Sequence, residues 1–221
     1  FHDNALSPIA ATPGEAAEIK KAFRKALADT GLVVPMATTD LAPHAPVITQ
    51  RFLGALTLAL DLHRLQLRKG TTIPYASHLL AVTALVLEHG GTEDQAIAAA
   101  LHDAVEDQGG QPTLDRIWSQ FGPNVARLVE ALTDADTTPK PPWRERKERY
   151  VARLATAPEE ALLVDLACKV HNARTIVRDL RREGAKAWER TGGGRDGSRW
   201  YYRALLEAMQ GRTSGAIVDE F

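Results

Sequence analysis

The chain has few cysteines, little net charge and no long apolar run, and each shortage excludes a class of protein. Its only cysteine, Cys168, rules out an internal disulfide framework and is typical of a reducing compartment, so we expect a cytoplasmic location. No apolar run is long enough to span a bilayer, so we expect no membrane association. The formal net charge of −1 gives no indication of a nucleic-acid partner.

Patterns typical of β-strands are also scarce. Apolar residues recur at helical spacing along nearly the whole chain of 221 residues, and convincing alternation of apolar and polar residues is missing. We therefore expect an all-α bundle of about ten helices. The expected helices lie near residues 12–31, 47–68, 77–89, 92–108, 113–121, 124–134, 143–156, 159–183, 185–190 and 197–210.

The same pattern divides the chain into three regions. We expect an N-terminal arm, a helix and a linker over residues 1–46, a helical domain over 47–210, and a flexible tail over 211–221. The sequence begins with Phe1 instead of Met, so we expect the true N-terminus to lie upstream.

One block of ionisable residues interrupts the apolar helical pattern. His102-Asp103 follows an apolar run, and Glu106 and Asp107 come one helical turn later. Positions i, i+3 and i+4 share a helix face, so Asp103, Glu106 and Asp107 are expected on one side. Three carboxylates there repel one another unless a cation or protons compensate their charge, which favours a functional site.

Two other segments supply residues of the types that bind metals. His78 lies near a helix start, where a lone histidine is often a cap instead of a ligand. Cys168 and His171 lie in a later helix, and His171 is expected either to hydrogen-bond within the site or to be a core histidine. Together with His102-Asp103 they favour a site for a first-row divalent ion, since imidazoles and carboxylates bind Mn, Fe and Zn.

Several motifs stand in a recognisable order along residues 47–210. They are Arg68-Lys69, Pro74-Tyr75-x-x-His78, His102-Asp103-x-x-Glu106-Asp107, Thr113 to Gly122, Leu128 to Asp134, Arg146 to Tyr150, and Lys169 to Thr175. In these motifs the chain resembles the HD-domain metal-dependent phosphohydrolases. Within them it is most similar to the hydrolase domain of the RelA/SpoT-type alarmone enzymes and to the small alarmone hydrolases. The resemblance implies an HD-domain helical bundle over residues 47–210.

The resemblance also implies an activity. It predicts a metal-dependent 3′-pyrophosphohydrolase that releases pyrophosphate from purine alarmones of the ppGpp, pppGpp or ppApp type, as in the stringent response. One divalent ion, usually Mn, is expected at His78, His102, Asp103 and the position of Cys168. Glu106 and Asp107 are expected to organise the attacking water.

A purine nucleotide is the expected partner. A guanidinium can stack on a base and a lysine can meet a phosphate, although Arg68-Lys69 alone would also suit a solvated helix end. The loop before Pro74 is one residue longer than the family pattern. The aromatic run 200–202 is expected to pack over the core, with a wall of the nucleotide pocket as the alternative. The residues that match substrate-binding positions are Arg68, Lys69, Lys169, Asn172, Arg174 and Thr175.

Cys168 departs from the family pattern, in which this ligand is an aspartate. A thiolate is softer and favours Zn or Fe over Mn. Three alternatives stay open: Cys168 is a ligand that changes the metal preference, the site works with three protein ligands and a water, or the site is impaired. Asp165, one turn earlier, is a candidate substitute, and Cys168 also fits a buried structural thiol.

Two other functions therefore stay open. One is another HD-type nucleotide phosphohydrolase, and the other is a catalytically impaired alarmone-binding protein. The sequence does not distinguish guanosine from adenosine alarmones, and it leaves a homo-oligomer open.

Overall fold

The structure is a computed structural model that describes residues 48–134, 141–209, 211–212, 217–218 and 221. All of these belong to one compact unit, which begins at Ala45. The arm, helix and linker expected over residues 1–46 lie outside the described residues, and so does the segment 135–140.

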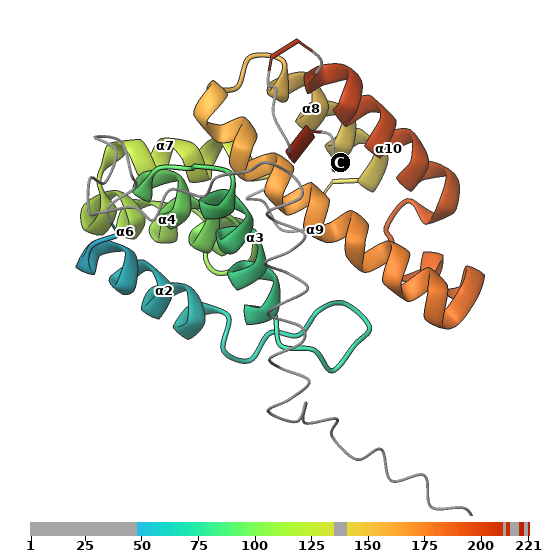
Figure 1. Cartoon of the computed structure of the whole chain (residues 1–221), viewed down its shortest axis with the longest axis horizontal. Coiled ribbons are helices and arrows are strands. Elements are labelled where there is room, and N and C mark those ends of the chain that lie inside the picture. The colour runs from blue at the N-terminus through green and yellow to red at the C-terminus, as the bar shows by residue number, and fades with distance from the viewer. Residues whose placement is uncertain (1–47, 135–140, 210, 213–216, 219–220) are drawn as a thin grey trace, which may run out of the picture. The chain divides into compact units, whose positions relative to one another are not determined.

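The described residues are helical and contain no strand, which confirms the all-α prediction (Figure 1). Within them, β-pairing is limited to an isolated bridge between Leu67 and Pro74. The elements are α2 (Gln50–Leu62), α3 (Ala76–Glu88), α4 (Glu93–Leu101), α5 (Ala104–Asp107), α6 (Gln111–Phe121), α7 (Pro123–Leu132), α8 (Trp143–Leu154), α9 (Glu159–Glu183), the 3-10 helix η1 (Gly184–Arg190) and α10 (Gly194–Met209).

The helix expected over residues 47–68 is shorter than predicted, because α2 ends at Leu62. The chain then folds back on itself over residues 66–75, which we call the 66–75 hairpin. Arg68 N donates to Ile73 O at 2.8 Å, and Tyr75 N donates to Gln66 O at 2.9 Å. Gly70, with a φ of 68°, provides the left-handed residue at its tip.

The helix expected over residues 92–108 is interrupted at the ionisable block. α4 begins with a capping box, in which Gln95 N donates to Thr92 Oγ1 at 3.3 Å and Thr92 N donates to Gln95 Oε1 at 2.8 Å. It ends at Leu101, and α5 begins only at Ala104. The carbonyl of Ala99 lies 2.8 Å from His102 Nδ1, so this side chain competes for a helical acceptor where the helix stops.

Two hydrophobic clusters hold the helices together, and α3 and α4 belong to both of them. The first cluster includes Leu79 of α3 with Ile97 and Leu101 of α4, and the second includes Val82 of α3 with Leu166 of α9. Residues 96–101 of α4 have no exposed surface. Because each fully buried Leu or Ile contributes about 1.5–3 kcal/mol, these helices provide a firm base for the residues at their ends.

The described part of the C-terminal segment packs against the domain. Ile217 is 3% exposed and belongs to the second cluster. The ring of Phe221 lies 5.6 Å from that of Tyr202. These residues of the expected tail are therefore in contact with the core.

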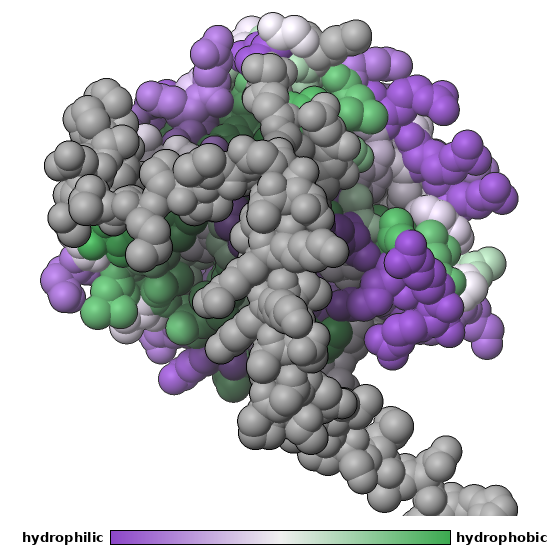
Figure 2. Space-filling model, viewed as in Figure 1, coloured by the Kyte–Doolittle hydropathy of each residue, from purple (hydrophilic) through white to green (hydrophobic). Residues whose placement is uncertain are grey.

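Hydrophilic side chains gather over the end of α9 and the adjoining η1, at the right of Figure 2. The end of α9 carries the exposed residues Arg181, Arg182 and Glu183. Among the described helices, none combines the length and the apolar character that a membrane crossing requires.

Candidate metal centre

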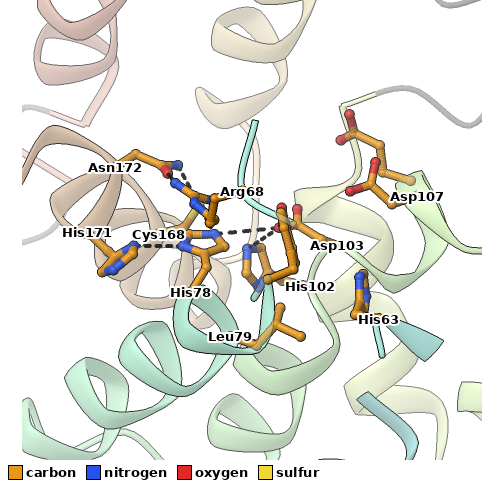
Figure 3. A network of polar contacts seen from close by, with 12 residues as sticks. His63, Arg68, His78, Leu79, His102, Asp103, Asp107, Cys168, His171 and Asn172 are labelled. Atoms are coloured by element: carbon orange, nitrogen blue, oxygen red, sulfur yellow. Dashed lines mark hydrogen bonds and ion pairs between the residues drawn. The ribbon is translucent and has the colours of Figure 1, made fainter. Parts of the chain in front are cut away.

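Two buried histidines face each other at the junction of the two clusters. His78, near the start of α3, is 1% exposed, and His102, just after α4, is 4% exposed. The Oδ2 atom of Asp103 lies 3.5 Å from His78 Nε2 and 2.9 Å from His102 Nε2 (Figure 3). The residues of the His-Asp motif therefore lie close to the histidine of the preceding motif, as the metal hypothesis requires.

The hydrogen bonds of His102 leave one ring nitrogen unsatisfied. Its Nδ1 lies 2.8 Å from Ala99 O, and a carbonyl can only accept, so Nδ1 carries the proton of this bond. His102 Nε2 is buried and has no hydrogen-bond partner, because its contact with Asp103 lacks the geometry of one. A buried polar atom without a partner is costly, and a cation would provide the missing partner.

Electrostatics at His102 also favour positive charge. Burial alone would lower the pKa of His102, but the charges of Asp103 and Cys168 raise it well above its usual value. Burial would raise the pKa of Asp103, but His102 and His78 keep it well below its usual value. The same negative groups that favour a proton on His102 would favour a metal cation there.

Cys168 supplies the third converging group, from the middle of α9. Its Sγ lies 3.8 Å from His78 Nε2, and the side-chain amide of Asn172 donates to it at 3.4 Å. Burial would raise the pKa of this thiol, but Lys169 and His102 outweigh burial and lower the pKa to about 5. Cys168 is therefore a thiolate at neutral pH, which is the form that binds metals.

These residues fit a single metal ion. One ligand atom each from His78, His102 and Cys168 lies within 4.8 Å of the other two, and all three side chains are buried. Asp103 adds a carboxylate oxygen beside both imidazoles. Two imidazoles, a thiolate and a carboxylate are ligands that Zn, Fe and Mn accept, with the thiolate favouring the first two.

His171 contacts the ring nitrogen of His78 that points away from Asp103 and Cys168. The Nδ1 atoms of the two rings are 2.7 Å apart (Figure 3). Burial, followed by the charges of His78 and Arg68, lowers the pKa of His171 to about 3, so this ring is neutral and can accept a hydrogen bond. When His78 donates it, His78 Nε2 keeps a lone pair that faces Asp103 and Cys168. Of the two interpretations of His171, the structure favours a hydrogen bond within the site.

The ligand atoms border a cavity of about 230 Å³ whose other walls are charged. Glu106 lines it, and its Oε2 accepts from the backbone N of Asp134 at 3.2 Å. Lys147 contacts the Asp134 carboxylate at 2.6 Å, and Lys169 contacts Asp165 at 3.0 Å. Sequence reasoning assigned no role to Asp134 or Lys147, although both lie in motifs that carry the family resemblance.

Asp165 also lines this cavity, but its partners differ from those of Cys168. It is fully buried, contacts Lys169, and accepts a hydrogen bond from the hydroxyl of Tyr150. It does not belong to the group of converging metal-ligand atoms among the described residues. Asp165 is therefore engaged by Lys169 and Tyr150 and does not replace Cys168 in that group.

The carboxylate of Asp107 has a different environment from those of Asp103 and Glu106. Its Oδ2 accepts from the side-chain amide of Gln66 at 2.8 Å, and it does not line the 230 Å³ cavity. Figure 3 places it beside His63, on the side of the histidines opposite to His171. Asp103, Glu106 and Asp107 all follow the interruption, and the backbone N of Asp107 donates to Asp103 O at 3.0 Å, so the three residues share one helical turn although the Asp107 side chain is held by Gln66.

A second cavity, of about 330 Å³, adjoins the first. Tyr75, Lys147 and Asn172 line both. Its volume is in the range of small-molecule sites. Tyr201 and Tyr202 of α10 form part of its wall. Tyr201 is also buried in the second hydrophobic cluster, so it both packs on the core and lines the cavity.

Five of the six expected substrate-binding residues line these cavities, and Arg174 does not. Arg68 lies in the second cavity, where its Nη2 donates to Asn172 Oδ1 at 2.7 Å. Arg174 is exposed and lines neither cavity. Lys169 lines the first cavity, and the second is lined by Arg68, Lys69, Asn172 and Thr175.

Comparison with known proteins agrees with this geometry. A family model described as "HD domain" matches residues 55–198. A guanosine-3′,5′-bis(diphosphate) 3′-pyrophosphohydrolase, MESH1, of Xenopus tropicalis is 37% identical over 139 residues, which are 62% of this chain and 73% of the relative. Its namesake from Homo sapiens is 38% identical over 143 residues, covering 62% of this chain and 74% of the relative.

A solved structure extends the likeness to three dimensions. It is that of a metazoan ortholog of SpoT, which is described as hydrolysing ppGpp and playing a role in starvation responses. It superposes with a TM-score of 0.65 at 26% sequence identity, and the match covers 80% of this chain and 94% of the other. The similarity therefore includes nearly the whole of that protein and most of the helical unit described above.

Proposed function

Because this chain belongs to the HD-domain family, related to the MESH1 and SpoT-type hydrolases, we propose that it is a metal-dependent 3′-pyrophosphohydrolase of purine alarmones. The substrates would be of the ppGpp, pppGpp or ppApp type, and pyrophosphate would be the product. The observation that carries the proposal is the adjacency of two cavities, one bordered by metal-binding groups and one of nucleotide size. The single cysteine suits a cytoplasmic setting.

In the proposed site, His78, His102, Asp103 and Cys168 hold one divalent ion. The chemistry that such an ion supplies is the polarisation of a water molecule and of a phosphoryl oxygen. The resemblance favours Mn, whereas the thiolate of Cys168 favours Zn or Fe. His171 keeps His78 Nε2 directed at the site through the contact between their Nδ1 atoms.

Glu106 is the proposed proton acceptor for the attacking water. Its carboxylate lines the cavity of about 230 Å³ beside the proposed ligands, which we call the metal-side cavity. The backbone N of Asp134 donates to this carboxylate, and the guanidinium of Arg146 lies 4.0 Å from it. A general base must lie within hydrogen-bond reach of the water, directly or through a second water. Of the other carboxylates in this cavity, Asp134 is held by Lys147 and Asp165 by Lys169, and the family resemblance gives the role of base to Glu106. Asp107 is proposed to support it from the neighbouring position.

The nucleotide would occupy the second cavity with its 3′-diphosphate directed into the first. Lys147, at the junction, and Lys169 would meet phosphate oxygens. Arg68, whose guanidinium lies 5.5 Å from the centre of the Tyr75 ring, would contact the base together with Asn172 and Thr175. Lys69 and the exposed Arg174 would contribute positive charge near the entrance.

The test is product analysis with ppGpp and ppApp in the presence of Mn, Zn or Fe(II). Release of pyrophosphate supports the proposal, whereas release of monophosphate from a wider nucleotide panel identifies another HD-type phosphohydrolase. Binding of ppGpp without turnover under any of these metals identifies a catalytically impaired alarmone-binding protein, the alternative that Cys168 suggests.

Glu106→Gln distinguishes catalysis from binding. It should lower kcat by at least about 100-fold, the usual contribution of a general base, while metal content and nucleotide binding are retained. The matched control is Glu148→Gln on α8, where an exposed glutamate pairs with Arg144. Equal turnover by the two variants would contradict the role given to Glu106.

A further inference from the structure

Gln66, in the 66–75 hairpin, lies at the centre of a polar network behind the metal-side cavity. Its Oε1 accepts from His63 Nδ1 at 2.7 Å and from Gln108 Nε2 at 2.6 Å. Its Nε2 donates to Asp107 Oδ2 at 2.8 Å. One amide thus joins the end of α2, the residue after α5, and a carboxylate of α5.

These contacts fix which way the amide points. Two donors face its oxygen, and a carboxylate, which can only accept at neutral pH, faces its nitrogen. Rotating the amide by half a turn would place oxygen against oxygen and nitrogen against two donors. The Asp107 carboxylate therefore determines the orientation of Gln66, and the contacts of its oxygen with His63 and Gln108 agree with that orientation.

The same hairpin also reaches Asp103. The backbone N of Tyr75 donates to Gln66 O at 2.9 Å, and the ring of His63 stacks on that of Tyr75 at 5.2 Å. The Tyr75 hydroxyl donates to Asp103 Oδ2 at 2.6 Å. Two side chains from one short segment thus hold the carboxylates at the two ends of α5, Tyr75 that of Asp103 and Gln66 that of Asp107.

We propose that Gln66 is a positioning residue for Asp107, and that the 66–75 hairpin sets the direction of the carboxylates at both ends of the segment 103–107. This inference rests on the proposed hydrolysis and adds to it a residue outside the metal ligands and the nucleotide contacts. Misplacement of a reacting group by about 1 Å can cost about 100-fold in rate, so the amide has a large effect without touching substrate.

The decisive variant is Gln66→Glu, which keeps the shape and the acceptor but turns the donor that faces Asp107 into a carboxylate oxygen. We expect kcat to fall between about 10- and 100-fold, with KM and metal content within about twofold of the unsubstituted protein. Gln66→Met, which removes the polar atoms at similar size, should give a loss of the same order.

The chain contains a closely matched control. Gln111 Nε2 donates to Asp115 Oδ1, also at 2.8 Å, on the exposed face of α6. Gln111→Glu makes the same chemical change at an equal contact and should leave kcat and KM unchanged. The proposal is overturned when Gln66→Glu and Gln66→Met keep kcat within twofold of the parent, or when their effect is confined to KM or to metal content.

A second measurement separates this inference from the proposed function. A double-mutant cycle of Gln66→Ala and Asp107→Ala, read as the unfolding equilibrium constant, requires no substrate. We expect the two changes to be non-additive by about tenfold, as for a hydrogen bond to a charged group. A parent protein without turnover would contradict the proposed function alone, whereas an additive cycle would overturn the contact on which this inference depends.

Discussion

The metal-side cavity has two walls of different kinds. One wall, from the start of α3 and the segment between α4 and α5, carries His78, His102 and Asp103. The other, from the middle of α9, carries Cys168 and Asn172. The first wall keeps the ligand types of the family pattern, and the second replaces the expected aspartate by a thiolate.

The difference shows how a site can change its ligand chemistry without changing its fold. On the first wall, ligand positions depend on buried residues of two clusters, including Leu79 and the fully buried residues 96–101. The second wall is buried as well, with Leu166, Ala167 and Val170 at most 1% exposed, but there the proposed ligand is one position of a regular helix. A substitution at Cys168 is therefore expected to change the metal preference of the proposed site without a break in the helix, whereas the proposed ligands of the first wall lie at the ends of helices.

The largest effect is expected from removing a ligand of the first wall. His102→Ala should abolish stoichiometric metal binding and lower turnover by more than about 100-fold, the loss that even residues outside the ligand sphere can cause. Metal analysis of the purified protein with a turnover assay measures it. The control is His89→Ala, because His89 Nδ1 contacts Leu85 O at 2.9 Å much as His102 contacts Ala99 O, but at a helix end outside the site.

A smaller effect is expected from a change on the second wall. It should alter which metal the site prefers more than whether the site binds a metal. Cys168→Asp should raise Mn occupancy and increase Mn-dependent turnover about tenfold, because a carboxylate suits Mn better than a thiolate does. Competition between Mn and Zn, followed by metal analysis, measures this. Cys168→Ser provides the control of similar size without charge. If Cys168→Asp loses turnover with unchanged metal occupancy, the role assigned to Cys168 is wrong.

The smallest effect concerns the nucleotide side, where the second wall meets the 66–75 hairpin through Arg68 and Asn172. Arg68→Ala should raise KM about tenfold, equivalent to about 1.4 kcal/mol, with kcat largely retained. Arg64→Ala, at a side chain that is 71% exposed in the same region, should leave both constants unchanged. A fall in kcat alone would instead link Arg68 to the chemistry.

Much of the fold could be predicted from the sequence because helix-forming signals are local. The apolar period predicted a helix near residues 159–183, and the structure has Glu159–Glu183. The capping box at Thr92 likewise marked the start of α4. The family motifs also brought His78, His102 and Cys168 into one site, where the structure places them within reach of one ion.

The rest depends on contacts between distant residues. The end of α2 was placed too late, because Leu65 and Leu67 continue an apolar pattern although they are 85% and 51% exposed in the loop that follows. The direction of Asp107 could not be predicted either, since it depends on Gln66, which is 41 positions away in the chain. Periodicity alone treats the segment 92–108 as one helix, and a side-chain contact at His102 accompanies the interruption.

The shared wall of Tyr75, Lys147 and Asn172 has a consequence for selectivity. A molecule that occupied both cavities would contact these three side chains, so its length would decide whether it reaches from one cavity into the other. A nucleotide with a single short phosphate could fill the larger cavity and still not reach the buried histidines. A free diphosphate could reach them but would forgo the contacts of the larger cavity. For the proposed function, the two cavities would therefore select substrates by the span between their base and their terminal phosphate as well as by charge.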